Sequence, residues 1–206
     1  MDAARNRERL LEAARGAFAE RGLDVPFDEI ARRAGVGIAT LYRRFPTRGE
    51  LVAAAFAPKV SSYAAAAEVA LDHRDPWKGF SDFVRTVCAM QAADAGFADV
   101  LALTFPTTPD FERDMQATLE RVQELVDRAQ RAGSLRADFV LEDLVMLLMA
   151  NAGVVNATKQ HAPKAWERFA AYMLDAFRAP GASRLPKPIS PIRMANAMRS
   201  AASRPS

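Results

Sequence analysis

The stretch that decides the fold is residues 27–45, which read FDEIARRAGVGIATLYRRF. Apolar residues recur at helical spacing on either side of two glycines, which predicts two short helices crossing at a tight turn. Ile30 lies on the expected inner face of the first helix, and Leu41 and Phe45, four residues apart, anchor the second. Gly35 is expected to adopt the positive φ that such a turn demands. The stretch therefore predicts a helix-turn-helix.

The outward face of the second helix carries small, hydroxyl and basic side chains. Gly37 can take the cap position, and a helix N-terminus with small residues can enter the major groove of DNA, where hydroxyl and guanidinium groups reach bases or phosphates. The alternative is an ordinary solvated face with no DNA role, and the spacing alone leaves both open. The candidate residues on this face are Ile38, Ala39, Thr40, Tyr42, Arg43 and Arg44.

The segments on either side extend this unit into a helical head. Residues 3–21 predict a helix with one apolar stripe, which ends at a glycine. Another helix is expected to start at Thr47, whose hydroxyl can cap it, and to run to about residue 73. Pro58 should kink or break that helix partway.

The rest of the chain also predicts helices, because alanine, leucine and arginine are abundant and alternating β-branched runs are missing. The expected helices cover residues 76–94, 96–105, 110–132, 141–158 and 162–179. The helix at 141–158 is almost wholly apolar and should be buried on most sides. We therefore expect an all-α fold.

Charge alone is weak evidence for a nucleic-acid partner. The chain of 206 residues has a formal net charge of +3. Residues 180–206 hold five basic side chains and no acid, so residues 1–179 carry a net charge of −2. Because the excess of basic residues lies in the tail, the arrangement of residues in the head must support a DNA-binding function.

Several classes of protein find no support in the sequence. We expect no membrane span and no signal peptide, and the single cysteine, Cys88, fits a reducing cytoplasm. No Cys/His spacing suggests a metal site, and no nucleophile motif or glycine-rich phosphate loop suggests an enzyme or a cofactor. A helical carrier or adaptor remains the alternative, although it would not explain the helix-turn-helix.

Residues 9–56 closely resemble the DNA-binding domain of the TetR (tetracycline-repressor-like) family. The marks are Glu-Ile-Ala at residues 29–31, Ala-Gly-Val-Gly at 34–37, Thr-Leu-Tyr-Arg-Arg-Phe at 40–45 and Thr-Arg-Gly-Glu-Leu at 47–51. The resemblance implies that Thr40 and Tyr42 touch DNA and that Arg48 meets a phosphate. It also implies a helical C-terminal domain, a homodimer and a small-molecule inducer.

The departures from the family pattern concern details of DNA contact. Pro26 stands where a capping Ser or Thr is common, Arg44 replaces a frequent histidine, Arg48 replaces a commoner lysine, and Gly49 weakens the first turn of the fourth helix. They leave the operator sequence undetermined. The candidate DNA-binding residues are Gly37, Ile38, Ala39, Thr40, Tyr42, Arg43, Arg44 and Arg48.

The effector pocket is expected among the helices between residues 60 and 160. Its candidate lining is aromatic and thioether-rich, which favours an apolar or aromatic inducer; ordinary core packing is the alternative for each residue. The candidates are Phe80, Phe83, Met90, Phe97, Leu101, Phe105, Phe111 and Met115. A ligand there could tilt the helix that follows Thr47 and so move the head.

The dimer surface is expected on residues 141–158 and 162–177, as the resemblance implies. Asn151 lies in an apolar helix, where it could face a ligand, the partner subunit or a local backbone group. The candidate interface residues are Leu144, Leu148, Asn151, Trp166, Phe169, Tyr172 and Met173.

These expectations divide the chain into three parts. Residues 1–50 form a three-helix helix-turn-helix domain, residues 51–179 a helical ligand-binding and dimerisation domain, and residues 180–206 a basic, proline-containing, flexible tail. The expected function is a cytoplasmic repressor, which a small-molecule inducer releases from a palindromic double-stranded DNA operator. No metal or cofactor is expected.

Overall fold

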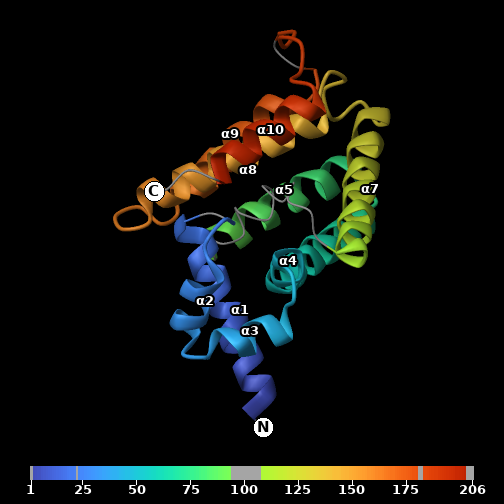
Figure 1. Ribbon diagram of the computed structural model, residues 1–206. Helices are drawn as coiled ribbons and strands as arrows, with labels where there is room; N and C mark the ends of the chain where they lie inside the picture. The colour runs from blue at the N-terminus through green and yellow to red at the C-terminus, as the bar shows by residue number, and fades with distance from the viewer. Residues whose placement is uncertain (1, 22, 94–107, 181–182, 203–206) are drawn as a thin grey trace.

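The computed structural model describes residues 2–21, 23–93, 108–180 and 183–202. These residues are almost entirely helical (Figure 1), as expected. The helices are α1 (Asp2–Arg21), α2 (Phe27–Ala34), α3 (Ile38–Arg44), α4 (Arg48–Leu71), α5 (Pro76–Ala93), α7 (Pro109–Arg131), α8 (Leu141–Thr158), α9 (Ala165–Phe177) and α10 (Pro191–Ala202). The fold is all-α, with an N-terminal helix-turn-helix unit and a helical body.

The head, formed by α1, α2 and α3, lies at one end of the molecule (Figure 1). Leu10, Ile30 and Leu41 contribute one buried side chain each from the three helices. The ring of Phe18 stacks on that of Phe56 at 6.0 Å, which joins α1 to α4. The apolar stripes that the sequence indicates therefore meet in one small core, and α4 continues from it into the body.

Helix α4 begins where the sequence predicts, because the Thr47 hydroxyl accepts a hydrogen bond of 3.2 Å from the backbone N–H of Glu50. The sequence predicts a kink or a break at Pro58; the break is absent, because the helix runs to Leu71 with Pro58 inside it. Helix α4 packs against α1, α5 and α7, and this burial outweighs the backbone hydrogen bond that proline removes.

The body is built around α5, which packs against α4, α7, α8 and α9. Gly79 permits its close approach to α4, because a Cβ at this position would lie 2.5 Å from the carbonyl oxygen of Ala70. Helices α8 and α9 form a pair on the other side of α5 (Figure 1). The body thus has two sides, with the long α4 on one and the α8–α9 pair on the other.

Helix α8 is less buried than its composition suggests. Among the described residues it is the one helix long and apolar enough to cross a membrane, and only 28% of it is buried inside the chain. Soluble proteins contain helices that pass the same test, so this is weak evidence for a membrane. The exposed apolar side chains of α8 include Met146 and Met149.

The tail differs from the flexible segment expected for residues 180–206. Residues Pro191–Ala202 form α10, and Met194 on it is buried. Arg136 donates to the carbonyl of Ser183 at 2.7 Å, and the N–H of Leu185 donates to Asp138 at 3.1 Å, which anchors the start of the tail to the turn before α8. The alanine and methionine content of residues 191–202 favours helix despite the preceding prolines.

Candidate DNA-binding interface

The turn between α2 and α3 has the predicted conformation. Gly35 has φ 65° and ψ 36°, in the left-handed region, and its N–H donates to Arg32 at 3.1 Å. The N–H of Val36 donates to Ala31 at 3.0 Å. Helix α2 starts at Pro26 without a side-chain cap, as the sequence indicates. The turn is therefore closed by its own backbone bonds and fixes the angle at which α3 leaves it.

Arg9 on α1 reinforces this turn, a role that sequence reasoning missed. Its Nη2 donates to the carbonyls of Ala34 at 2.5 Å and Gly35 at 3.2 Å. A Cβ on Gly35 would lie 3.0 Å from that nitrogen. Nothing in the sequence distinguishes Arg9 from the other arginines of α1, because its role depends on how α1 crosses the turn.

Helix α3 is anchored on one side and open on the other. Leu41 and Phe45 are buried, as predicted, whereas Ile38 is 41% and Tyr42 52% exposed. Thr40 is half-buried. The other exposed candidates are Gly37, Ala39, Arg43 and Arg44. The structure therefore brings seven of the eight predicted residues together on α3 and its cap, leaving their exposed side free for contact.

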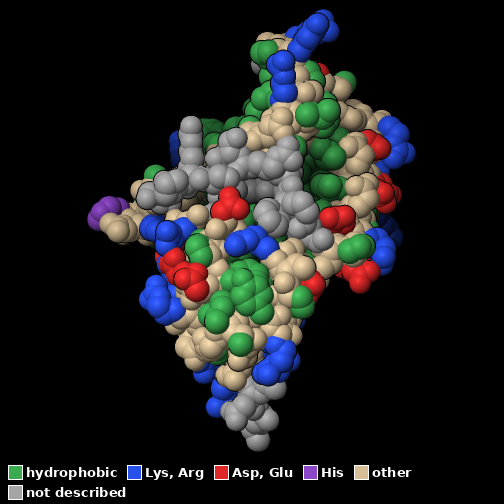
Figure 2. Space-filling model, viewed as in Figure 1, with side chains coloured by type: hydrophobic (Ala, Val, Ile, Leu, Met, Phe, Trp, Pro, Cys, Tyr) green, Lys and Arg blue, Asp and Glu red, His purple; other side chains and the backbone are tan. Residues whose placement is uncertain are grey.

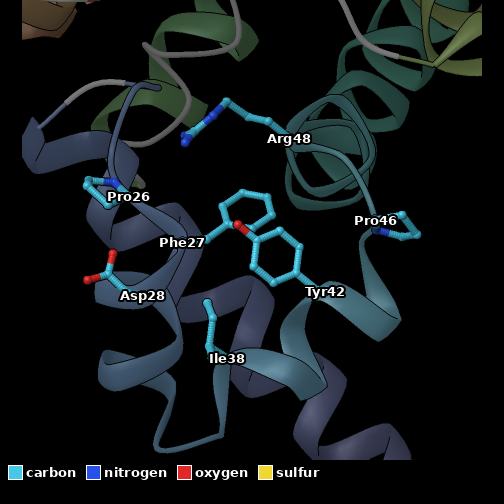
Figure 3. A pocket seen from close by; sticks show the side chains of 7 residues that line it. All are labelled: Pro26, Phe27, Asp28, Ile38, Tyr42, Pro46 and Arg48. Atoms are coloured by element: carbon cyan, nitrogen blue, oxygen red, sulfur yellow. The ribbon is translucent and has the colours of Figure 1, made fainter.

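The remaining candidate, Arg48, lies across a hollow from α3 (Figure 3). The Phe27 ring is 5.1 Å from that of Tyr42, and the Arg48 guanidinium is 5.2 Å from the Phe27 ring. The hollow has a volume of about 460 Å³. Its lining consists of Pro26, Phe27, Asp28, Ile38, Tyr42, Pro46 and Arg48. The Tyr42–Phe27–Arg48 row ties the exposed face of α3 to the start of α4.

Arg48 also has a structural role that the sequence did not indicate. Its Nη1 donates to the carbonyls of Leu23 at 2.6 Å and Val25 at 2.7 Å, in the loop between α1 and α2. One guanidinium thus holds this loop, the Phe27 ring and the start of α4 together. Its contact with a phosphate stays a prediction. Any such contact would use the guanidinium N–H groups that do not donate to the loop.

The charges of the head are arranged so that α3 keeps unpaired cations. Arg33 pairs with Glu20 and Glu29, each at 2.7 Å, and these hydrogen bonds raise the pKa of Arg33; Arg21 also pairs with Glu29. Among the described residues, Arg43 and Arg44 make no ion pair. In Figure 2 basic side chains predominate at the lower end of the head. The exposed side of α3 therefore favours a polyanion.

Arg5 and Arg7 belong to the first helix rather than to a separate N-terminal arm. Both lie within α1, and the Arg7 guanidinium is 5.8 Å from the centre of the Phe45 ring, at the end of α3. The helix propensity of the surrounding Ala, Glu and Arg residues extends α1 to Asp2.

Two of the predicted pocket residues, Phe83 and Met90, line a groove of about 350 Å³ between α4 and α5. The rest of its lining is Ser62, Ala65, Ala66, Val69, Ala70, His73, Asp82 and Thr86. Phe80 and Phe111 are buried in the core, and Met115 packs against it. Phe97, Leu101 and Phe105 lie outside the described residues. The groove is the described cavity closest to the predicted pocket.

The predicted interface residues separate into two groups. Leu144, Leu148 and Asn151 are buried within the subunit. On α9, Tyr172 is 57% exposed, and Trp166, Phe169 and Met173 are half-buried. Sequence reasoning missed Met146 and Met149, which are 40% and 38% exposed on α8. Their spacing from Leu144 and Leu148 places them on the opposite side of the helix, but an all-round apolar sequence does not indicate which side is buried.

Comparison with known proteins supports the architecture on both sides of α4. Residues 10–55 match the family model for bacterial regulatory proteins of the tetR family. Residues 75–179 match the model for the C-terminal domain of SbtR-like transcriptional regulators. A search among curated proteins finds no match.

Solved structures of transcriptional regulators are similar to this chain in fold. A TetR family transcription regulator from Marinobacter aquaeolei VT8 is 17% identical, with a TM-score of 0.65 over 85% of this chain and 96% of that one. The regulator FadR from Bacillus subtilis, solved in complex with stearoyl-CoA, is 15% identical, with a TM-score of 0.57 over 82% and 98%. A TetR transcription regulatory protein from Mycobacterium vanbaalenii is 37% identical over 86% and 98%, with a TM-score of 0.43.

The two family models cover both functional parts of the molecule. The first spans the head with its turn and α3, and the second spans the body from the start of α5 to the end of α9. The chain belongs to the TetR family of transcriptional regulators, and its α2–α3 unit is a DNA-binding helix-turn-helix.

Proposed function

We propose that the protein is a cytoplasmic repressor that binds a palindromic operator as a homodimer and leaves it when a small molecule binds the body. The observation that carries the proposal is the exposed side of α3, with Arg43 and Arg44 free of ion pairs among the described residues and the helix held by a rigid turn. Ile38, Ala39 and Thr40 lie at its N-terminal end, where a recognition helix contacts base edges. Tyr42 and Arg48 are proposed to contact phosphates.

Dimerisation follows from the limited reach of one recognition helix. One helix reads too few base pairs for useful specificity, whereas two related by a twofold axis read two half-sites. The exposed apolar side chains Met146, Met149 and Tyr172 make α8 and α9 the best surface for this contact. The buried Leu144 and Leu148 would support that surface from beneath.

The link between body and head is α4, which arginines hold at both ends. At the head, Arg48 holds the Leu23–Val25 loop. At the body, Arg128 of α7 donates to the carbonyl of Leu71, the last residue of α4, and at 2.9 Å to that of His73, two residues further on. A ligand in the α4–α5 groove would press on α4 between these two attachments. The proposed release mechanism is a tilt of α4 that changes the spacing of the two heads.

The groove favours a mostly apolar effector. Phe83, Met90 and Val69 form its apolar part, and His73 and Asp82 lie at its polar end, 3.5 Å apart. FadR from Bacillus subtilis, which shares the fold, was solved in complex with stearoyl-CoA, and this supports regulation by a small molecule. A coupling of about 1–3 kcal/mol would weaken operator binding by roughly 5–150-fold.

The proposal is tested by recovering genomic DNA bound to the purified protein and measuring its affinity against salt concentration. We expect a palindromic site, with binding that falls steeply as salt increases. Arg43→Ala and Arg44→Ala should each weaken binding, whereas Arg74→Ala, at the exposed α4–α5 turn, should not. Recovery of no preferred sequence, or affinity independent of salt and of both α3 arginines, would favour a helical carrier without a DNA role.

A further inference from the structure

A polar pair lies in the otherwise apolar contact between α5 and α8. Gln91 is 1% exposed and Asn151 is 0% exposed. The Asn151 Nδ2 donates to the backbone carbonyl of Cys88 at 3.3 Å and to the Gln91 Oε1 at 2.9 Å. Asn151 therefore faces α5 within its own subunit.

The pair leaves one donor and one acceptor without a partner. The Gln91 Nε2 and the Asn151 Oδ1 are both buried, and within the part of the chain that the structure describes neither makes a hydrogen bond. An unpartnered buried polar group costs free energy, so two of them beside each other call for an explanation.

The orientation of both amides is fixed by chemistry. The Cys88 carbonyl accepts only, so the Asn151 amide must point its nitrogen at it. That nitrogen also faces Gln91, so the Gln91 amide must point its oxygen at Asn151. Rotating either amide by 180° would set two donors or two acceptors against each other. The free groups are therefore an N–H₂ on Gln91 and a carbonyl oxygen on Asn151.

These two groups restrict the chemistry of an occupant. A carboxylate would accept from Gln91 but repel the Asn151 oxygen, and an ammonium group would do the reverse. A hydroxyl group donates and accepts at once. The nearby Cys88 thiol adds no charge, because burial raises its pKa to about 12.

We propose that Gln91 and Asn151 form a buried polar subsite between α5 and α8, separate from the His73–Asp82 end of the groove, that binds the hydroxyl group of an uncharged effector. This rests on the proposed effector-controlled function and specifies its ligand class. Gln91 is adjacent to Met90, which lines the α4–α5 groove, so α5 lies between that groove and the amide pair. A ligand held by Asn151 would contact the helix that carries the proposed dimer surface.

The test uses the full chain and pairs of compounds that differ only in a hydroxyl or a methyl group: phenol and toluene, cyclohexanol and methylcyclohexane, 1-naphthol and 1-methylnaphthalene. Calorimetry gives the dissociation constants. We expect the hydroxyl member of at least one pair to bind about tenfold more tightly, since two buried neutral hydrogen bonds are gained. The side-chain amide resonances of Gln91 and Asn151 should shift with that compound.

Paired replacement tests the residues themselves. Gln91→Met with Asn151→Leu removes both amides while keeping volume and burial, so it should retain the fold and lose the hydroxyl preference. Asn156→Leu is the matched control, because Asn156 lies on the exposed side of α8 and its loss should leave the preference unchanged.

Each outcome has a distinct meaning. Equal binding of both members of every pair, no binding by any, or a preference that survives the paired replacement would overturn the proposal. Amide cross-peaks to a bound water that persist with every compound would assign the pair to an internal water and also overturn it. Operator affinity is measured in the same samples without compound, so a failure of DNA binding is separated from a failure of this site.

Discussion

Arg48 contacts both the backbone of the head and the hollow beside α3, so its replacement has two separable effects. Arg48→Ala removes bonds to the Leu23 and Val25 carbonyls and should lower the unfolding free energy by about 1–3 kcal/mol. It should also weaken binding to all DNA sequences and reduce the salt dependence by about one unit. Urea unfolding and DNA titration at several salt concentrations measure the two effects.

Arg48→Lys distinguishes the two roles. It keeps the positive charge but loses the planar stack on Phe27, so we expect reduced stability with an unchanged salt slope. An unchanged salt slope in Arg48→Ala would instead limit Arg48 to a structural role. Arg74→Ala, in the body, serves as the control for general loss of charge.

Two glycines of the turn provide a second test at the residue scale. Gly35 has positive φ and faces Arg9, so Gly35→Ala should destabilise the protein by about 1–2 kcal/mol. Gly37 has φ −69° and open space around it, so Gly37→Ala should change stability by less than about 0.5 kcal/mol. The added methyl group on the exposed side should still alter operator affinity. Equal melting temperatures of the two variants would contradict the assigned roles.

At the scale of elements, the contact between α4 and α5 depends on one position. A Cβ at Gly79 would overlap the Ala70 carbonyl, so Gly79→Ala must separate the two helices and should cost about 1–3 kcal/mol. Gly16→Ala on exposed α1, with nothing within 4 Å, should gain up to about 1 kcal/mol. Thermal unfolding checks both. If α4 transmits the signal, Gly79→Ala should also change effector response; a response identical to the parent would exclude this contact from the mechanism.

The hydrogen bonds of Asp138 to Arg136 and Leu185 predict that attachment of the tail depends on pH. Arg136 hydrogen-bonds Asp138 and, with the Leu185 N–H, lowers the Asp138 pKa from its ordinary value. A carboxyl whose pKa is lower in the folded state stabilises that state above its unfolded pKa of about 4 and loses this contribution as pH falls further. Proteolysis near residues 183–185 should therefore accelerate below pH 4. The Asp138→Asn variant should be cleaved at neutral pH as fast as the parent is cleaved in acid. If variant and parent are cleaved at the same rate at pH 7, the ion pair does not hold the tail.

At the scale of the whole molecule, features that depend on nearby residues were predicted from the sequence, whereas features that depend on contacts between distant segments were not. The turn, its glycine, the Thr47 cap and the all-α class follow from spacing within a few residues, and the structure confirms them. Three features depend instead on how distant segments cross: the hydrogen bonds of Arg9 to the α2–α3 turn, the two roles of Arg48, and the contact of Asn151 with α5. The α10 helix was missed because prolines in its first part obscure the helix propensity of its second.

The difference between buried and exposed side chains on α8 decides which substitutions test dimerisation. Leu148 is a candidate interface residue in the sequence, but its side chain is buried within its own subunit, so a charge there would disrupt the body rather than report on assembly. Met149 and Tyr172 are exposed on α8 and α9 and can be replaced without entering the subunit core. Met149→Glu and Tyr172→Glu are therefore the informative variants.

We expect each variant to produce folded monomers, because a carboxylate in an apolar twofold contact faces its own copy and must lose its hydration. Operator affinity should fall by at least about a hundredfold, since one head without its partner loses half of the recognised bases. Binding to random duplex DNA should fall much less, because the head is intact. Sedimentation measures the assembly, and Glu167→Gln, on the exposed surface of α9, is the control. A monomeric parent, or dimeric variants with full operator affinity, would rule out α8 and α9 as the dimer surface.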